Sequence, residues 1–469
     1  MSFHLAKCID VTPRGTSQAF GKDNYLQMRS EPWSQELVDN VSHVRFWADF
    51  PSLWPNGHEP LGTGAGAFPF AVFDACIRKA NEDGLKVIVV PYRYPRWVSF
   101  THGFATTSDE NLYRNPEDRC TLAQWLAFIR DPANPTLRNE IDRQQRDLEY
   151  EMPLHLPPPF AHFAGHHPES FWGLFVRELF ERYVRRSETH GRLDYFEVVN
   201  EPNFQLWPQR SAAADPSWPT EGSPPGRFGL DGSRLVVQEH VAEMMETVDF
   251  FARQYEELYD KRVMCLAPST ADHDRTAQRR LFTVAVNTPW STAPDPFTNA
   301  LLDELERRRF KGGSRWIWSY HNYADMERDH AKAGYMRAAL GKRWRGRTRD
   351  GGPAMMATEG GIRISELQER FGALPTGRRR RAQAAMLEAA FKRHRRSTGN
   401  GAGVELLTQY TVHADRNFDT GLRNLDTATT PRPSWDAWVG LKEFDAHDPL
   451  PSEWRPDDTF TPFDISTVD

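Results

Sequence analysis

The feature that most constrains the fold is an alternation of short apolar runs with amphipathic segments along nearly the whole chain. Eight runs rich in β-branched or apolar residues have the length of buried strands. They span residues 3–9, 43–47, 86–91, 195–199, 263–267, 315–320, 354–358 and 404–410. Helical patterns span residues 33–40, 68–82, 169–189, 233–258, 298–309, 327–340, 378–396 and 434–443. Eight strands alternating with eight helices predict an α/β fold, a single (β/α)₈ TIM barrel.

An open, doubly wound sheet is the competing layout. Such a sheet usually carries a glycine-rich phosphate loop after its first strand, and none follows residues 3–9. We therefore expect a catalytic barrel over residues 1–445 and a C-terminal tail, 446–469, that packs on the barrel or trails from it. The sequence shows no internal repeat and no linker to a separate module.

Two loops are far longer than usual connections. They cover residues 95–168, after the third strand, and 202–232, after the fourth. Loops that follow strands lie at the C-terminal face of a barrel, where active sites form. We expect both insertions to wall a pocket.

Composition limits the classes of function. The 469 residues are 39% hydrophobic and 26% charged, which is typical of a folded protein, and the net charge of -6 argues against a nucleic-acid binder. The N-terminus has no apolar signal core, and no segment is long enough to span a bilayer. We expect a cytoplasmic protein with no membrane partner, or a secreted one if a targeting segment was removed. Nothing in the sequence indicates an oligomeric state.

Neither the cysteines nor the loop histidines have metal-ligand spacing. We expect buried free thiols at Cys8, Cys76, Cys120 and Cys265. Histidines 155, 162, 166 and 167 lack the helical pair with a flanking glutamate that marks zinc sites. A metal-dependent barrel hydrolase would also need a His-x-His after the first strand, and FHLAKCIDV offers only His4. The sequence therefore predicts no metal and no cofactor.

Two glutamates stand at the ends of different strands. Glu201 ends the fourth strand in DYFEVVNEPNF, and Glu359 ends the seventh in AMMATEGG. Glycosidic cleavage requires such a pair, one to protonate the leaving oxygen and one to attack the anomeric carbon or activate water. Taken singly, Glu201 also suits a helix start and Glu359 a turn before two glycines. If both are catalytic, the charge of Glu359 should raise the pKa of Glu201.

Other strand ends supply polar groups that match this chemistry. Arg45, in HVRFW, would keep a nearby nucleophilic carboxylate ionised. His321 and Tyr323, in WSYHNYAD, occupy alternate positions and so share a side. The tyrosine hydroxyl suits a hydrogen bond to the nucleophile, and the histidine suits substrate or the acid/base. Asn200 suits the sugar 2-hydroxyl.

This ordered set resembles the clan A glycoside hydrolases, and most closely family 5, the cellulase-like glycosidases. FEVVNEP is similar to that family's fourth-strand motif, His321-Asn322-Tyr323 to its sixth-strand His-x-Tyr, TEGG to its nucleophile motif, and Arg45 to its second-strand arginine. The resemblance covers residues 40–412. It implies an O-glycosyl hydrolase with Glu201 as acid/base, Glu359 as nucleophile and a retaining mechanism, with a bias towards β-linked oligosaccharides or glycosides as substrates.

The substrate contacts are less well indicated. The eighth strand, LLTQYTVHAD, lacks the tryptophan that the clan usually presents beneath the reacting sugar, and Tyr410 or His413 would take its place. Trp54, Trp97 and Trp207 follow strand ends and are candidate sugar platforms or loop-packing residues. Asp49 and Asp415 are polar candidates for hydroxyl contacts. The main alternative function is a barrel that binds carbohydrate without cleaving it.

Overall fold

The central element of the structure is a closed barrel of eight parallel strands. A computed structural model describes residues 5–11, 25–54, 68–92, 165–205, 236–271, 294–327, 332–349, 352–395, 404–413, 419–424, 430–442 and 463–468. The strands are β1 (Ala6–Val11), β2 (His43–Asp49), β3 (Lys86–Tyr92), β4 (Tyr195–Glu197), β5 (Met264–Leu266), β6 (Trp316–His321), β9 (Met355–Glu359) and β10 (Val404–Gln409). Around the barrel the order is β1-β10-β9-β6-β5-β4-β3-β2. The predicted TIM barrel is confirmed.

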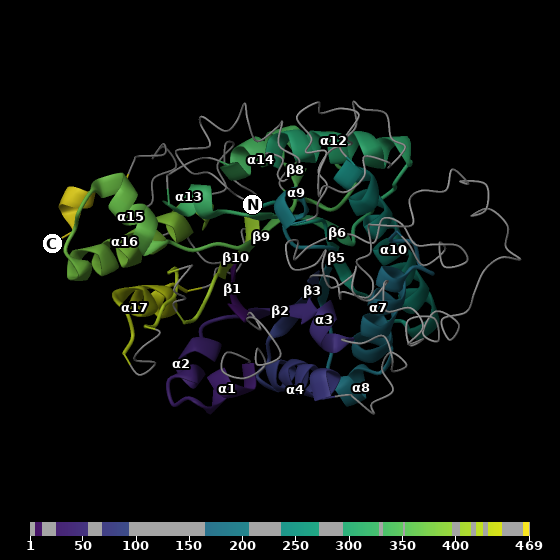
Figure 1. The fold of residues 1–469 in the computed structure, drawn as a ribbon, viewed down its shortest axis with the longest axis horizontal. Coiled ribbons are helices and arrows are strands. Elements are labelled where there is room, and N and C mark those ends of the chain that lie inside the picture. The colour runs from purple at the N-terminus through teal and green to yellow at the C-terminus, as the bar shows by residue number, and fades with distance from the viewer. Residues whose placement is uncertain are drawn as a thin grey trace, which may run out of the picture.

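Helices surround these strands in chain order (Figure 1). The outer layer contains α1 (Tyr25–Ser30), α2 (Ser34–Val38), α4 (Phe68–Glu82), α7 (Phe171–Phe180), α8 (Ser187–His190), α10 (Val236–Tyr259), α12 (Pro294–Arg307), α14 (Lys332–Leu340), α15 (Ile364–Phe371), α16 (Thr376–Arg395) and α17 (Pro433–Gly440). Three short helices, α3 (Phe50–Leu53), α9 (Pro202–Gln205) and α13 (Tyr323–Glu327), directly follow strands or strand ends. They therefore lie at the C-terminal face of the barrel.

Several elements differ from the prediction in their bounds. The first strand runs to Val11, two residues beyond the predicted end, because Asp10 and Val11 pair with Arg45 and Phe46 of β2. The predicted helix over 169–189 is α7, a π-helical turn at Glu181–Arg185, and α8. Helices α1 and α15 and a small hairpin of β7 (Thr348–Arg349) with β8 (Gly352–Pro353) were not expected.

The strand alternation divides the core into layers. Side chains such as Val44 and Phe46 face the helices and join the main hydrophobic cluster. Cys8, Ile88 and Met356 point inward and, with neighbouring apolar residues, fill the lower barrel. The remaining inward positions, towards the C-terminal ends of the strands, carry aromatic and charged groups. The barrel interior is therefore apolar at the bottom and polar at the mouth.

The other expectations concern thiols, the tail and membrane segments. Cys8, Cys76 and Cys265 are buried free thiols, as expected, and Cys120 lies outside the described residues. In the tail, residues 463–468 include a 3-10 turn, Ile465–Thr467. Arg378 of α16 donates hydrogen bonds to Val468 O at 2.9 Å and to Ile465 O at 3.2 Å. Among the described helices, none combines the length and the apolar character that crossing a bilayer requires.

Candidate active site

Glu201 lies on a sharp turn after β4. Its backbone φ is +42°, in the left-handed region that residues other than glycine rarely adopt. Hydrogen bonds on both sides hold this turn: the Glu201 amide donates to Ser269 O at 2.8 Å, and the Asn203 side chain exchanges hydrogen bonds with the backbone of Ala271. Unfavourable backbone conformations of this kind persist where surrounding contacts enforce them, often at functional sites.

Glu359 is the last residue of β9 and pairs with His321 of β6. Gly360 follows, at a point where a side chain would not fit: an added Cβ would lie 1.8 Å from Asn322 Oδ1. The Asn322 amide also donates to Glu359 O at 3.1 Å. The glycine of the TEGG segment thus lets the chain after β6 pack closely beside the end of β9, which fixes the base of the Glu359 side chain.

His321 connects the two carboxylates. Its Nδ1 lies 2.9 Å from Glu201 Oε1, and its Nε2 lies 3.6 Å from Glu359 Oε2. One carboxylate oxygen of each glutamate and one ring nitrogen of His321 lie within 4.8 Å of one another. The side chains of Glu201 and Glu359 are 14% and 7% exposed, so both are largely withdrawn from water yet not sealed off. Two acids from different strands therefore converge at the barrel mouth.

Arg45 ties Glu359 to three other strand-end groups. Its guanidinium donates to Glu359 Oε2 at 3.2 Å, to Asp10 Oδ2 at 2.7 Å, to both oxygens of Glu197 at 2.8 and 2.9 Å, and to Asn200 Oδ1 at 2.7 Å. The arginine has no exposed surface. Nearby carboxylates raise its pKa despite burial, so it remains charged.

Asp10 and Glu197 belong to this network and were not among the predicted site residues. Both are fully buried, and Asp10 also accepts a hydrogen bond from Trp47 Nε1 at 2.9 Å. Glu197 accepts from Ser269 and, at 3.5 Å, from Thr358. One arginine thus faces three buried carboxylates, and Glu201 adds a fourth acid nearby. Such a site favours the retention of at least one proton, because buried charges of one sign repel each other.

Aromatic side chains form one wall of the site. The Tyr323 hydroxyl donates to Glu359 Oε1 at 2.8 Å. The rings of Tyr323 and Tyr410 meet edge to face with centroids 6.5 Å apart, and Trp47 lies 6.5 Å from Tyr410 and 4.3 Å from Tyr92. Tyr410 therefore lies close to the nucleophile candidate, directly after β10, the eighth strand of the barrel. The Tyr410–Thr411 peptide bond is cis.

The protonation of this site follows from burial and mutual charge. Burial and the nearby charge of Glu201 raise the pKa of Glu359, His321 and Arg45 lower it, and the net pKa is about 7. Burial lowers the pKa of His321, but Glu359 and Glu201 outweigh it and leave the pKa above its ordinary value. The pKa of Tyr323 is raised by burial and by Glu359, which keeps its hydroxyl a donor.

Several residues that the sequence predicted as contacts to the sugar make other contacts in the structure or lie outside its described part. Trp54 is 3% exposed and stacks with Phe50, so it belongs to the hydrophobic core and offers no open platform. The ring of His413 packs on Trp33 at 5.5 Å, which favours Tyr410 over His413 as the aromatic of the eighth strand. Asp49 accepts a hydrogen bond from Ser52. Trp97, Trp207 and Asp415 lie outside the described residues.

Two groups among the described residues have the donors and spacing to hold a metal ion. One is Glu201, His321 and Glu359; the other, away from these residues, is His166, His240 and Glu243. In the first group the fixed charge of Arg45 lies 3.2 Å from Glu359 and disfavours a second cation there. The arrangement of Glu201, His321 and Glu359 suits proton transfer and attack by a carboxylate.

Solved structures match most of this chain at low sequence identity. A β-glucosidase from Thermotoga maritima in complex with glucoimidazole matches with a TM-score of 0.50 and 10% identity, over 93% of this chain and 96% of the other. A GH5_18 structure from Bifidobacterium longum subsp. longum matches with a TM-score of 0.33 and 12% identity, over 93% and 78% of the two chains. No protein-family model and no curated sequence matches. The β-glucosidase match shows a shared fold.

Proposed function

We propose that this barrel is a retaining glycoside hydrolase of the clan A type, with Glu359 as nucleophile and Glu201 as acid/base. The observation that carries the proposal is the contact of one imidazole, His321, with both carboxylates, at 2.9 Å to Glu201 and 3.6 Å to Glu359. The β-glucosidase that shares the fold acts, by its name, on a glucoside, which agrees with this assignment. The proposed substrate is an oligosaccharide or glycoside, with a bias towards β-linkage.

The spacing of the two acids supports retention over inversion. Retaining enzymes hold their carboxyl groups roughly 5–5.5 Å apart, whereas inverting enzymes need roughly 6.5–9.5 Å to admit a water molecule. Oxygens of Glu201 and Glu359 come within 4.8 Å of each other. So close an approach of single oxygens agrees better with the shorter spacing, and we propose direct attack by a carboxylate.

In the first step the Glu359 carboxylate attacks the anomeric carbon while Glu201 donates its proton to the glycosidic oxygen. The bond from the anomeric carbon to that oxygen breaks, the leaving group departs as an alcohol, and a glycosyl ester forms on Glu359. Attack requires the ionised form of Glu359, and donors from Tyr323 and Arg45 at 2.8 and 3.2 Å stabilise that form. In the reactive state of the pair, the proton is on Glu201.

In the second step Glu201, now ionised, takes a proton from water as the water oxygen attacks the anomeric carbon. The ester to Glu359 breaks, and the sugar leaves with its original configuration. His321 supports both steps, because a hydrogen bond to Glu201 orients the acid in one and the base in the other. Asn200, held by Arg45 at 2.7 Å, is the proposed contact to the sugar 2-hydroxyl.

A panel of aryl glycosides tests the proposal and identifies the sugar. We expect wild type to release the phenol from at least one β-glycoside. With that substrate, nuclear magnetic resonance should show that the first sugar released has the anomeric configuration of the substrate. Release of the opposite anomer would contradict a retaining mechanism. No turnover of any glycoside, with binding of oligosaccharides intact, would favour the non-catalytic barrel.

A further inference from the structure

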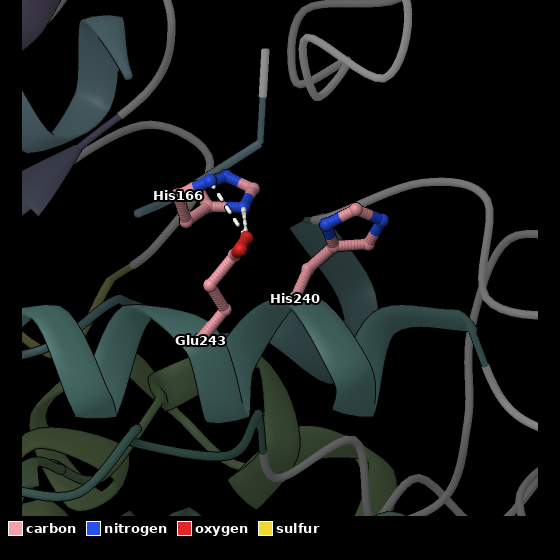
Figure 2. A group of neighbouring side chains, drawn as sticks. All are labelled: His166, His240 and Glu243. Atoms are coloured by element: carbon pink, nitrogen blue, oxygen red, sulfur yellow. Dashed lines mark hydrogen bonds and ion pairs between the residues drawn. The ribbon is translucent and has the colours of Figure 1, made fainter. Parts of the chain in front are cut away.

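A second cluster of metal-ligating side chains lies where the two long insertions rejoin the barrel. His166 stands next to the start of the described segment 165–205, and His240 and Glu243 lie near the beginning of α10 in the segment 236–271. Figure 2 shows His240 and Glu243 projecting from α10 towards the ring of His166. One ligand atom from each of the three side chains lies within 4.8 Å of the others.

We propose that His166, His240 and Glu243 bind a structural divalent ion of the zinc class. Two imidazoles and a carboxylate are ligands that zinc accepts, with a water molecule as the fourth. Ligand atoms at roughly 2.1 Å from a tetrahedral zinc lie roughly 3.4 Å apart, so closing this cluster needs side-chain shifts of roughly 1 Å or less. His166 Nδ1 and Glu243 Oε2, at 3.9 Å, are already close to that spacing.

The backbone around His166 is arranged to hold the cluster. The His166 amide donates to Glu243 Oε2 at 2.8 Å, and Thr247, one turn further along α10, donates to His166 O at 2.7 Å. Gly165, at φ +74°, leaves space for the carboxylate, because an added Cβ there would lie 3.1 Å from Glu243 Oε2. Glu243 is therefore fixed before any ion binds.

The rings of the two histidines lie together beside the Glu243 carboxylate. His166 has no exposed surface, and its ring meets that of His240 at a centroid distance of 5.2 Å and an angle of 76°. The neighbouring Glu243 carboxylate is 28% exposed, so an ion arriving from solvent can reach it. Two imidazoles and this carboxylate then offer nitrogen and oxygen ligands at one point.

An ion here would tie the chain before α7 to α10. His166 precedes α7, which packs directly against α10, and these helices follow β3 and β4. The bond would anchor the end of the first insertion at the C-terminal side of the barrel without touching the glutamate pair. Its expected effect is on stability.

Zinc binding to the full-length protein tests the inference. We expect equilibrium dialysis against ZnCl₂, followed by elemental analysis, to give about one zinc per chain. His240→Ala and Glu243→Gln should each weaken binding by roughly 100-fold or more, beyond the 10–100-fold typical of losing an outer-shell partner. Zinc should also raise the Tm of wild type and leave that of His240→Ala unchanged.

Matched variants separate this site from other binding. His167→Ala removes a neighbouring histidine, Glu246→Gln a neighbouring glutamate of α10, and Glu359→Gln one acid of the other metal-capable group; all three should keep the zinc. No zinc bound by wild type, or binding unchanged in both His240→Ala and Glu243→Gln, would overturn the inference. Loss of zinc in Glu359→Gln alone would do so too, because it would place the ion at the glutamate pair.

Discussion

Arg45 and Glu197 form a bidentate ion pair inside the barrel, with Nε 2.8 Å from Oε2 and Nη2 2.9 Å from Oε1, and neither side chain has exposed surface. The same guanidinium contacts Glu359, so the pair anchors the cation that faces the proposed nucleophile. A buried cation between carboxylates is costly to remove, because each acid left behind is a desolvated charge.

Replacing Arg45 should therefore destabilise the whole protein. We expect Arg45→Met to lower the free energy of unfolding by about 3–5 kcal/mol, measured by urea denaturation near pH 7. Arg253→Met is the control, because Arg253 pairs with Asp249 on the surface at 50% exposure and should cost less than about 1 kcal/mol. Equal losses in the two variants would refute a special role for the buried pair.

Tyr323→Phe should reduce activity with the fold intact. The change removes the 2.8 Å hydrogen bond to Glu359 and keeps the ring. A hydrogen bond to a charged group contributes about 1.5–3 kcal/mol, so kcat/KM should fall by roughly 10–100-fold. Tyr25→Phe is the control: its hydroxyl donates to Asp83 at 2.7 Å, and its removal should leave kcat/KM unchanged. Full activity in Tyr323→Phe would count against Glu359 as nucleophile.

The pH–rate profile should have two limbs. Activity falls with decreasing pH as Glu359 becomes protonated, and falls with increasing pH as Glu201 loses its proton. Since burial raises the pKa of Glu359 to about 7, the midpoint of the acidic limb should lie at a higher pH than the pKa of an ordinary carboxyl group. The measurement is kcat/KM from pH 4 to 10 on the best substrate of the panel. A rate that stays at its plateau up to pH 9 would contradict the assignment of Glu201.

The same raised pKa predicts how stability depends on pH. A group whose pKa is higher in the folded state binds its proton more tightly there, so its contribution is present at low pH and lost as pH rises through the folded pKa. For Glu359 this window runs from its ordinary 4.5 to about 7. Glutamine mimics the protonated acid. The free energy of unfolding of Glu359→Gln should therefore rise relative to that of wild type as the pH is raised from 5 to 8.

Glu304→Gln is the control variant, because the pKa of Glu304 is lowered where that of Glu359 is raised. Burial opposes the shift, but hydrogen bonds from Arg307 and Arg308 leave the pKa of Glu304 below its ordinary value. Its effect on stability should be constant between pH 5 and pH 8, because both its pKa values lie below that range. If the difference in unfolding free energy between Glu359→Gln and wild type also stayed constant from pH 5 to pH 8, burial would not raise the pKa of Glu359.

The sequence pattern predicted the barrel and most residues of the candidate site, because the C-terminal strand ends of a closed barrel face one mouth. Glu201, His321, Tyr323, Glu359 and Arg45 stand at or near such ends, and the structure brings them together. Asp10 was not predicted as a site residue because the predicted first strand ended at residue 9. In the structure, pairing with β2 extends the strand to Val11. Only the neighbouring strand decides that boundary.

Glu197 was missed for a different reason. It lies in the middle of the predicted strand 195–199, whose other residues are apolar, and a charged residue there can be interpreted only once its partner is known. The inward position, four residues before Glu201, was a usable signal, because a buried charge requires a partner. The cluster of His166 with His240 and Glu243 had no local signal, since packing of α7 against α10 creates it.

Chemical rescue of Glu359→Ala tests directly whether Glu359 is the nucleophile. Removing the nucleophile should lower turnover of an aryl β-glycoside with an activated leaving group by roughly 10⁴-fold or more. Azide fills the space of the lost carboxylate and attacks from the same side, so added azide should restore phenol release and yield a glycosyl azide of inverted configuration. Turnover by Glu359→Ala equal to wild type, or azide product with retained configuration, would contradict the account.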